Sequence, residues 1–215
     1  MAARGRPRAF DEEEVLDIAM RLFWEHGYDG TSMSELTEAM GINRRSIYAA
    51  FGNKEALFAA ALEHYIAGPG AFVNKARALP TARQVAEAFL RGSVEAFTSS
   101  DRPSGCMAVQ SALTCSDAAA AVRSELAARR VTGVDAFRER FDRAQLEGDL
   151  PADVDTHALA SYIVALSNGI SVQANSGIGR AALSRMVELV LSTWPSAELA
   201  IASGSSGDAA QPRAE

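Results

Sequence analysis

Hydrophobic residues recur every three or four positions along most of the chain, and capping residues and glycines divide this pattern into segments. Four segments come first, over residues 11–27, 32–40, 44–51 and 54–66. Later segments cover residues 81–98, 106–114, 117–147, 153–175 and 179–194. β-Branched clusters are few and prolines fall between the segments, so the pattern predicts an all-α fold.

The segments over residues 32–40 and 44–51 are both short, and a three-residue turn containing Gly41 joins them. A longer segment precedes them, and this order is typical of a helix-turn-helix motif. Capping side chains support the boundaries, because Ser32 with Glu35 fits a capping box and Asn43 and Asn53 fit N-caps.

Length and composition fit a folded protein with two domains. The chain has 215 residues, of which 48% are hydrophobic and 22% are charged, and its net charge is −6. We predict a flexible basic arm over residues 1–9, a helix-turn-helix domain over 10–66, a larger helical domain over 67–200 and a disordered tail over 201–215. Because neither a secretory signal nor a long apolar run is present, we expect a cytoplasmic protein that does not enter a membrane.

The two cysteines, Cys106 and Cys115, lie nine residues apart and form no CxxC motif. Such a pair provides no disulfide framework. The simpler interpretation is two small buried residues on a helix, and a thiol switch is the alternative.

Positive charge is confined to two short stretches of this acidic chain. Residues 1–10 contain three arginines and no acid, whereas residues 11–40 contain one arginine and nine acids. Residues 41–58 contain Arg44, Arg45 and Lys54 against a single acid, Glu55. This distribution favours a molecule that presents one face to a polyanion and keeps the other face negative.

The adjacent Arg44 and Arg45 stand at the start of the second short helix, where the helix dipole disfavours cations. In a helix-turn-helix protein this end of the second helix meets base edges in the major groove. Arginine can donate two hydrogen bonds to guanine there. We therefore predict that residues 44–49 read double-stranded DNA.

Other side chains on the same surface suit DNA as well. Ser46 lies within the predicted reading stretch, Tyr48 can bond a phosphate, and Ala49 can contact a thymine methyl group. Helix N-termini bind phosphate, which gives three further candidates: Thr31, Ser32 and Lys54. The basic arm adds candidates for the DNA backbone or minor groove, or it is simply a solvated tail: Arg4, Arg6 and Arg8.

At these residues the run from Phe10 to Leu62 resembles the DNA-binding domain of TetR/AcrR transcriptional regulators. The matching elements are Ala19-x-x-Leu22-Phe23, Gly27-Tyr28-x-Gly30-Thr31-Ser32, Gly41-Ile42, Ile47-Tyr48-x-x-Phe51 and Lys54-Glu55-x-Leu57. Leu36-Thr37 departs from the Ile-Ala usual in the family. The resemblance implies a sequence-specific regulator with a C-terminal helical domain that dimerises and binds a small effector, most often a repressor that the effector releases from a palindromic operator.

The last two long segments carry apolar stripes that are broader than one core contact needs. With the resemblance, they predict a homodimer that closes a four-helix bundle, although intradomain packing alone would also produce such stripes. The predicted interface residues are Ile163, Leu166, Ile170, Met186, Val190 and Trp194.

The middle segments supply aromatic and polar side chains of the kind that line ligand pockets. The candidates for an effector pocket are Phe97, Met107, Gln110, Phe137, Phe141, Tyr162 and Asn168. Because no cluster of like charges lies on the expected inner faces, we expect an uncharged, apolar effector.

No pattern indicates an enzyme, a metal site or a cofactor. His26, His64 and His157 are scattered, and none has metal-ligand spacing with the cysteines. The stretch Gly177-x-Gly179-x-x-Ala182 matches a loose dinucleotide fingerprint but follows a predicted helix rather than a strand. Two alternatives remain open: an architectural DNA-binding protein without an effector, and a transcriptional activator.

Overall fold

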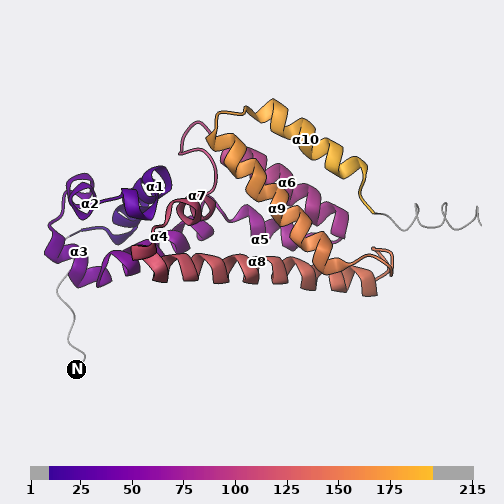
Figure 1. The fold of residues 1–215 in the computed structure, drawn as a ribbon, viewed down its shortest axis with the longest axis horizontal. Helices are drawn as coiled ribbons and strands as arrows, with labels where there is room; N and C mark the ends of the chain where they lie inside the picture. Colours follow the sequence, from indigo (N-terminus) through magenta and orange to yellow (C-terminus); the bar gives the residue numbers. More distant parts are fainter. Residues whose placement is uncertain (1–9, 196–215) are drawn as a thin grey trace, which may run out of the picture.

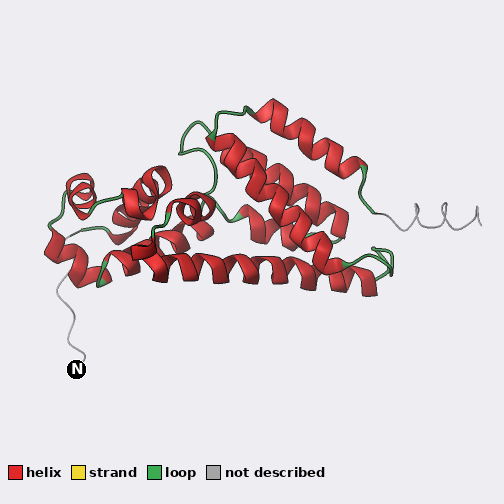
Figure 2. Ribbon diagram, viewed as in Figure 1, coloured by secondary structure: helices red, strands yellow, loops and turns green. Residues whose placement is uncertain are grey.

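A computed structural model describes residues 10–195 of the chain, and all regular structure within them is helical (Figures 1 and 2). The α-helices are α1 (Glu12–Gly30), α2 (Met33–Met40), α3 (Arg44–Phe51), α4 (Lys54–Ala67), α5 (Phe72–Arg77), α6 (Ala82–Phe97), α7 (Met107–Thr114), α8 (Ala120–Leu146), α9 (Thr156–Asn175) and α10 (Arg180–Ser192). A 3-10 turn, Asp117–Ala119, leads into α8. The prediction of an all-α fold is confirmed.

Local hydrogen bonds explain where the helices of the motif begin. The Ser32 hydroxyl accepts from the Glu35 amide at 3.1 Å, and the Glu35 carboxylate accepts from the Ser32 amide at 3.0 Å. The side-chain oxygens of Asn43 and Asn53 cap α3 and α4 through the amides of Ser46 and Ala56, respectively. Because these residues satisfy amides that a helix leaves free, the three helices begin within one residue of their predicted starts.

The structure differs from the sequence pattern in three places that have a clear local cause. Gly27 breaks α1 with a positive φ of 71°, but helical structure resumes after it and continues to Gly30. The six-residue α5 was not predicted, because it has no capping side chain and follows a Gly-Pro-Gly stretch. α9 begins at Thr156, where Asp155 caps it, rather than at residue 153.

The N-terminal core joins α1–α4 with segments from further along the chain. Ile47 and Leu36 are fully buried in this core and Phe51 packs against it, as their spacing predicts. α7 and the first turns of α8 also belong to it, and the Trp24 indole N–H donates to the Gly105 carbonyl at 3.1 Å. Packing therefore crosses the predicted domain boundary at residue 67.

The second core lies among α5, α6, α8, α9 and α10, and the 27-residue α8 runs along both halves of the molecule (Figure 1). Ile163, Ile170 and Trp194 are buried in this core, with Trp194 packed against the ring of Phe141. Their prediction as dimer contacts is therefore corrected, because these side chains already fill the interior of their own subunit. Leu166, Met186 and Val190 are only partly buried at its edge.

Candidate nucleic-acid interface and ligand cavity

α2 and α3 form the end of the molecule that lies away from α10 (Figure 1). Gly41 makes the turn between them with a φ of 64°, a left-handed conformation that costs other residues energy. Fully buried Ile47 anchors one face of α3, so the opposite face turns outward. Arg44, Arg45 and Ala49 are exposed there, as is Tyr48 at 37%.

The two arginines at the start of α3 differ in their surroundings. The Arg44 guanidinium donates to the Tyr48 hydroxyl from Nε at 2.9 Å and from Nη2 at 2.7 Å, and it lies 5.2 Å from the ring centroid. Arg45 forms no hydrogen bond or ion pair with any residue in the 10–195 range. Arg44 is thus held on its own helix, whereas Arg45 is free to meet a partner.

The start of α3 carries no acid in its first turn, and its cap is the neutral amide of Asn43. The Asn43 oxygen accepts from the amide of Ser46 at 2.9 Å and from its hydroxyl at 3.2 Å. Uncompensated amides and two arginines therefore make this end of α3 positive. The Ser46 hydroxyl, predicted to face DNA, is engaged with the cap in the unbound protein.

Of the two hydroxyls at the start of α2, one is not available to phosphate. Thr31 is fully buried, and its hydroxyl donates to the Gly27 carbonyl at 2.8 Å, with the Leu22 carbonyl 3.2 Å away. Its prediction as a phosphate ligand is corrected, because the side chain closes the kinked end of α1. Ser32 is exposed, and its hydroxyl, which accepts the capping bond, keeps its own proton for another acceptor.

Lys54 stands at the start of α4 as predicted, but its ammonium lies over the Tyr28 ring, 4.2 Å from the centroid. Burial lowers the pKa of Lys54, and the charges of Asp29 and Glu55 act in the opposite direction. A phosphate contact by Lys54 stays a prediction. Arg4, Arg6 and Arg8 lie outside the described residues.

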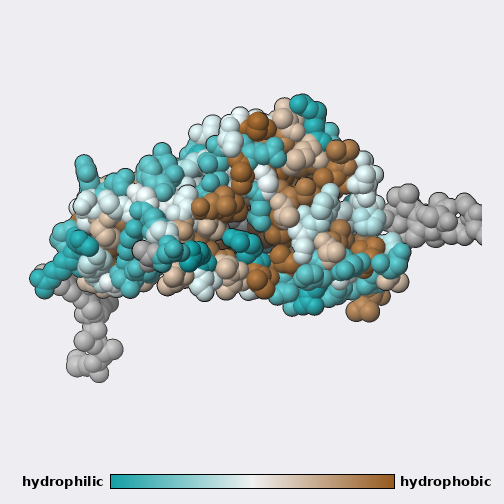
Figure 3. Space-filling view, in the orientation of Figure 1, coloured by the Kyte–Doolittle hydropathy of each residue, from teal (hydrophilic) through white to brown (hydrophobic). Residues whose placement is uncertain are grey.

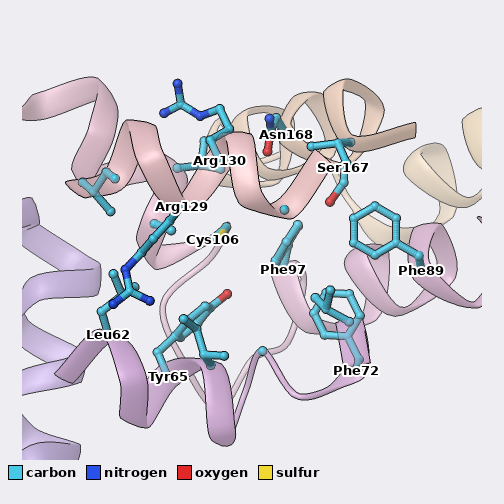
Figure 4. Close-up of a pocket in the computed structure, with 18 of the residues that line it drawn as sticks. Leu62, Tyr65, Phe72, Phe89, Phe97, Cys106, Arg129, Arg130, Ser167 and Asn168 are labelled. Carbon is cyan, nitrogen blue, oxygen red and sulfur yellow. The ribbon is translucent and has the colours of Figure 1, made fainter. Parts of the chain in front are cut away.

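An apolar cavity of about 280 Å³ lies between α4, α5, α6, α8 and α9 (Figure 4). Of the predicted pocket residues, Phe97, Phe137 and Asn168 line it. The other four do not. Met107 and Phe141 are buried in the two cores, Tyr162 is half exposed, and Gln110 contacts Asn175 through a 3.3 Å hydrogen bond. These four placements correct the prediction, because helical spacing alone does not say which interior a side chain enters.

Two polar residues that were not predicted from the sequence, Tyr65 and Arg129, also line the cavity. Tyr65 is buried with its hydroxyl directed into the space, and burial raises its pKa well above the usual value, so it is a neutral hydrogen-bond donor (Figure 4). Arg129 reaches the same region from α8. A signal for Arg129 was present, since it interrupts the apolar stripe that runs from Leu126 to Phe137.

The two cysteines flank α7 and have free thiols. Cys106 lines the cavity, whereas Cys115 lies near Asp29 at the N-terminal domain, where burial raises the pKa of its thiol. Both are partly buried rather than fully buried. A redox role for the pair stays a prediction.

Neither a membrane span nor a metal-binding cluster is found among residues 10–195. None of their helices combines the length and apolar character needed to cross a bilayer. No group of three or more His, Cys, Asp or Glu side chains among them could hold a metal ion.

A basic, outward-facing helix that follows a short helix and a glycine turn is what helix-turn-helix proteins insert into the major groove. The comparisons with known proteins agree, and the chain is a DNA-binding transcriptional regulator of the helix-turn-helix class. Residues 15–61 match the profile of "Bacterial regulatory proteins, tetR family", and residues 82–188 match "Tetracyclin repressor-like, C-terminal domain".

Two relatives and one solved structure extend this match. The chain is 32% identical to the HTH-type transcriptional repressor ComR of Escherichia coli (strain K12), over 90% of this chain and 93% of that protein. It is also 32% identical to the uncharacterized regulator YezE of Bacillus subtilis (strain 168), over 74% of this chain and 83% of that protein. A cysteine mutant of the TetR family regulator CifR, complexed with double-strand operator DNA, has a TM-score of 0.84 and 43% identity over 88% of this chain and 100% of that chain. The chain therefore belongs to the TetR family of transcriptional regulators.

Proposed function

We propose that the chain is a homodimeric repressor that binds a two-fold-symmetric operator through α3 and leaves it when a small molecule enters the cavity. The observation that carries the DNA-binding part is the exposed Arg45 without a partner in residues 10–195, at the positive end of α3. ComR is named a repressor and the CifR mutant is bound to operator DNA, which supports the same role here. Such a regulator acts where the chromosome lies, in the cytoplasm.

In vitro selection tests this role. The purified protein would be incubated with sheared genomic DNA from its own source, and the bound fragments sequenced. We expect a two-fold-symmetric site that the Arg44→Ala/Arg45→Ala variant no longer enriches. The matched control is Arg83→Ala/Arg91→Ala, which removes the same charge from α6. Uniform binding to all fragments with a steep salt dependence would instead support the architectural alternative.

The direction of regulation needs its own measurement. A repressor bound at a promoter should reduce transcription by purified polymerase from a template that carries the selected site. Increased transcription from that template would support the activator alternative, which uses the same α3 surface.

The surface of α9 and α10 supports the dimer. Apolar side chains gather over these two helices, whereas the end that carries α2 and α3 is mostly hydrophilic (Figure 3). Tyr162 and Val172 on α9 are 50% and 43% exposed, and Leu189 on α10 is 69% exposed. Large exposed apolar side chains that adjoin one another commonly mark protein interfaces. Leu166, Met186 and Val190 are only partly buried on the same two helices, which supports these three as contacts in the proposed dimer.

Leu189→Glu tests the interface, because it places a charge where two subunits would exclude water. We expect the variant to sediment as a monomer at concentrations at which the wild type is a dimer. Leu146→Glu is the matched control, since Leu146 is 89% exposed at the end of α8 and belongs to neither α9 nor α10. A dimeric Leu189→Glu variant would refute the proposed interface.

A further inference from the structure

The charge of the cavity wall is unlike the charge of the chain. The net charge is −6, yet the wall contains two arginines, Arg129 and Arg130, and no aspartate or glutamate. The expectation of an uncharged effector rested on the absence of a cluster of like charges on the inner faces, whereas two adjacent arginines line this wall. The remaining wall is mostly apolar, with aromatic rings from Phe72, Phe89 and Phe97.

Arg129 is the charged group that reaches toward α4. Its guanidinium extends from α8 toward Leu62 and Tyr65, whereas that of Arg130 points away from the cavity centre (Figure 4). Nη2 of Arg129 donates to Glu63 at 2.5 Å and to Glu125 at 2.9 Å, and Nε donates to Glu125 at 3.1 Å. Nη1 forms no hydrogen bond with any described residue, so two donors of the guanidinium remain unused.

We propose that the cavity binds a small amphipathic monocarboxylate, whose apolar part lies among the phenylalanines and whose carboxylate binds Arg129. Arginine suits a carboxylate because its planar fork can donate two parallel hydrogen bonds. Arg130 adds positive potential at the same wall without contacting the ligand. This inference rests on the proposed function, since it names the class of effector for the same cavity.

Binding of the carboxylate would compete with Glu63. The Glu63 side chain is 61% exposed, so water can solvate it readily once it leaves Arg129. Arg129 is 34% exposed and also pairs with Glu125, so its guanidinium is not left without a carboxylate when Glu63 moves away. Glu63 belongs to α4 and Arg129 to α8, so the exchange would remove a direct tie between the helix that ends the DNA-binding domain and the helix that spans the molecule.

Calorimetric titration of the full-length protein tests the proposal with 4-phenylbutanoate and its neutral isostere 4-phenylbutanamide. The two probes have the same apolar part, so their difference reports the carboxylate alone. We expect the acid to bind the wild type about tenfold more tightly than the amide. Arg129→Gln should reduce this preference to within about twofold while the amide still binds, which shows that the cavity is intact.

Two further variants separate recognition from general charge effects. Glu63→Gln removes the competitor, so it should tighten binding of the acid by about threefold and leave the amide unchanged. Arg123→Gln is the matched control, because Arg123 lies on α8, pairs with Asp117 and does not line the cavity. It should behave as the wild type does.

Equal binding of acid and amide, or no binding of the acid, would overturn the proposal. A preference for the acid over the amide that persists in Arg129→Gln would also overturn it. If Glu63→Gln leaves the affinity for the acid unchanged, the proposed competition between the ligand and Glu63 is refuted. None of these titrations contains DNA. If the titration fails but the operator selection succeeds, the carboxylate effector is rejected and the regulator function is retained. If the selection fails but the titration succeeds, only the proposed regulator function is rejected.

Discussion

Arg45→Ala is the substitution that tests the reading surface most directly. Arg45 is exposed and has no partner among residues 10–195, so its loss should leave the free energy of unfolding almost unchanged. Arg44 differs, because it must first give up two hydrogen bonds to Tyr48 before it can reach a base. We therefore expect Arg45→Ala to weaken operator binding at least as much as Arg44→Ala.

The magnitude follows from the contact that is lost. A bidentate pair between arginine and guanine discriminates against other bases by about 1–3 kcal/mol. A homodimer on a two-fold-symmetric operator loses this contact twice, and distant sites add, so the total is about 2–6 kcal/mol. Each 1.4 kcal/mol corresponds to a factor of about ten, which gives a loss of at least about 30-fold in affinity.

Fluorescence anisotropy with the selected operator and its single-base-pair variants measures this loss. If Arg45 reads a guanine, Arg45→Ala should lose the preference at one position of each half-site and bind the variants there with similar affinity. If it binds phosphate, affinity should fall equally on every sequence, and the salt slope should decrease by about one per subunit. Undiminished operator binding by a folded Arg45→Ala protein would refute the role of this residue altogether.

Three other substitutions test particular contacts. Tyr48→Phe removes the hydroxyl that is predicted to bond a phosphate, so operator affinity should fall about two- to tenfold in anisotropy, and an unchanged affinity would mean that the Tyr48 hydroxyl contacts no phosphate. Thr31→Val should lower the free energy of unfolding by about 1–2 kcal/mol in urea without changing the operator affinity of the folded protein, and a weaker affinity would restore Thr31 as a phosphate ligand. Gly27→Ala should cost more than about 1 kcal/mol, because Gly27 has a positive φ and a Cβ there would lie 2.4 Å from the Thr114 hydroxyl oxygen. Adding Thr114→Ala should relieve the clash but not the backbone strain, and full recovery in urea denaturation would show that φ contributes nothing.

The helix-turn-helix end could be predicted from the sequence because short-range signals define it. Caps at Ser32, Asn43 and Asn53 act within three residues, and Gly41 makes its turn locally. The exposure of Arg44 and Arg45 also follows from helical spacing, because Ile47 faces the core. Such features depend on neighbours in the chain and need no knowledge of distant packing.

The cavity could be predicted only in part, because it is made by contacts between distant helices. Phe137 and Phe141 are the same type of residue, one turn apart on α8. Phe137 lines the cavity, whereas Phe141 packs against Trp194. The position of Thr31 before α2 predicts a phosphate ligand, but its hydroxyl lies 2.8 Å from the Gly27 carbonyl and donates to it. Leaving a buried carbonyl without a hydrogen bond costs free energy, so the Thr31 hydroxyl stays with the Gly27 carbonyl. Sequence spacing alone does not reveal this contact.

α4 is the element that can connect the cavity to the reading surface. Its last turns supply Leu62 and Tyr65 to the cavity wall, and its first residue, Lys54, follows α3 after two residues. At 1.5 Å per residue the 14-residue helix is about 21 Å long, so a tilt of about 5° at the cavity end would move the other end by about 2 Å. Hydrogen bonds to bases tolerate only about 0.5 Å of variation in length. A ligand that shifts α4 by a small angle would therefore be enough to remove α3 from register with a half-site, without any unfolding of the DNA-binding domain.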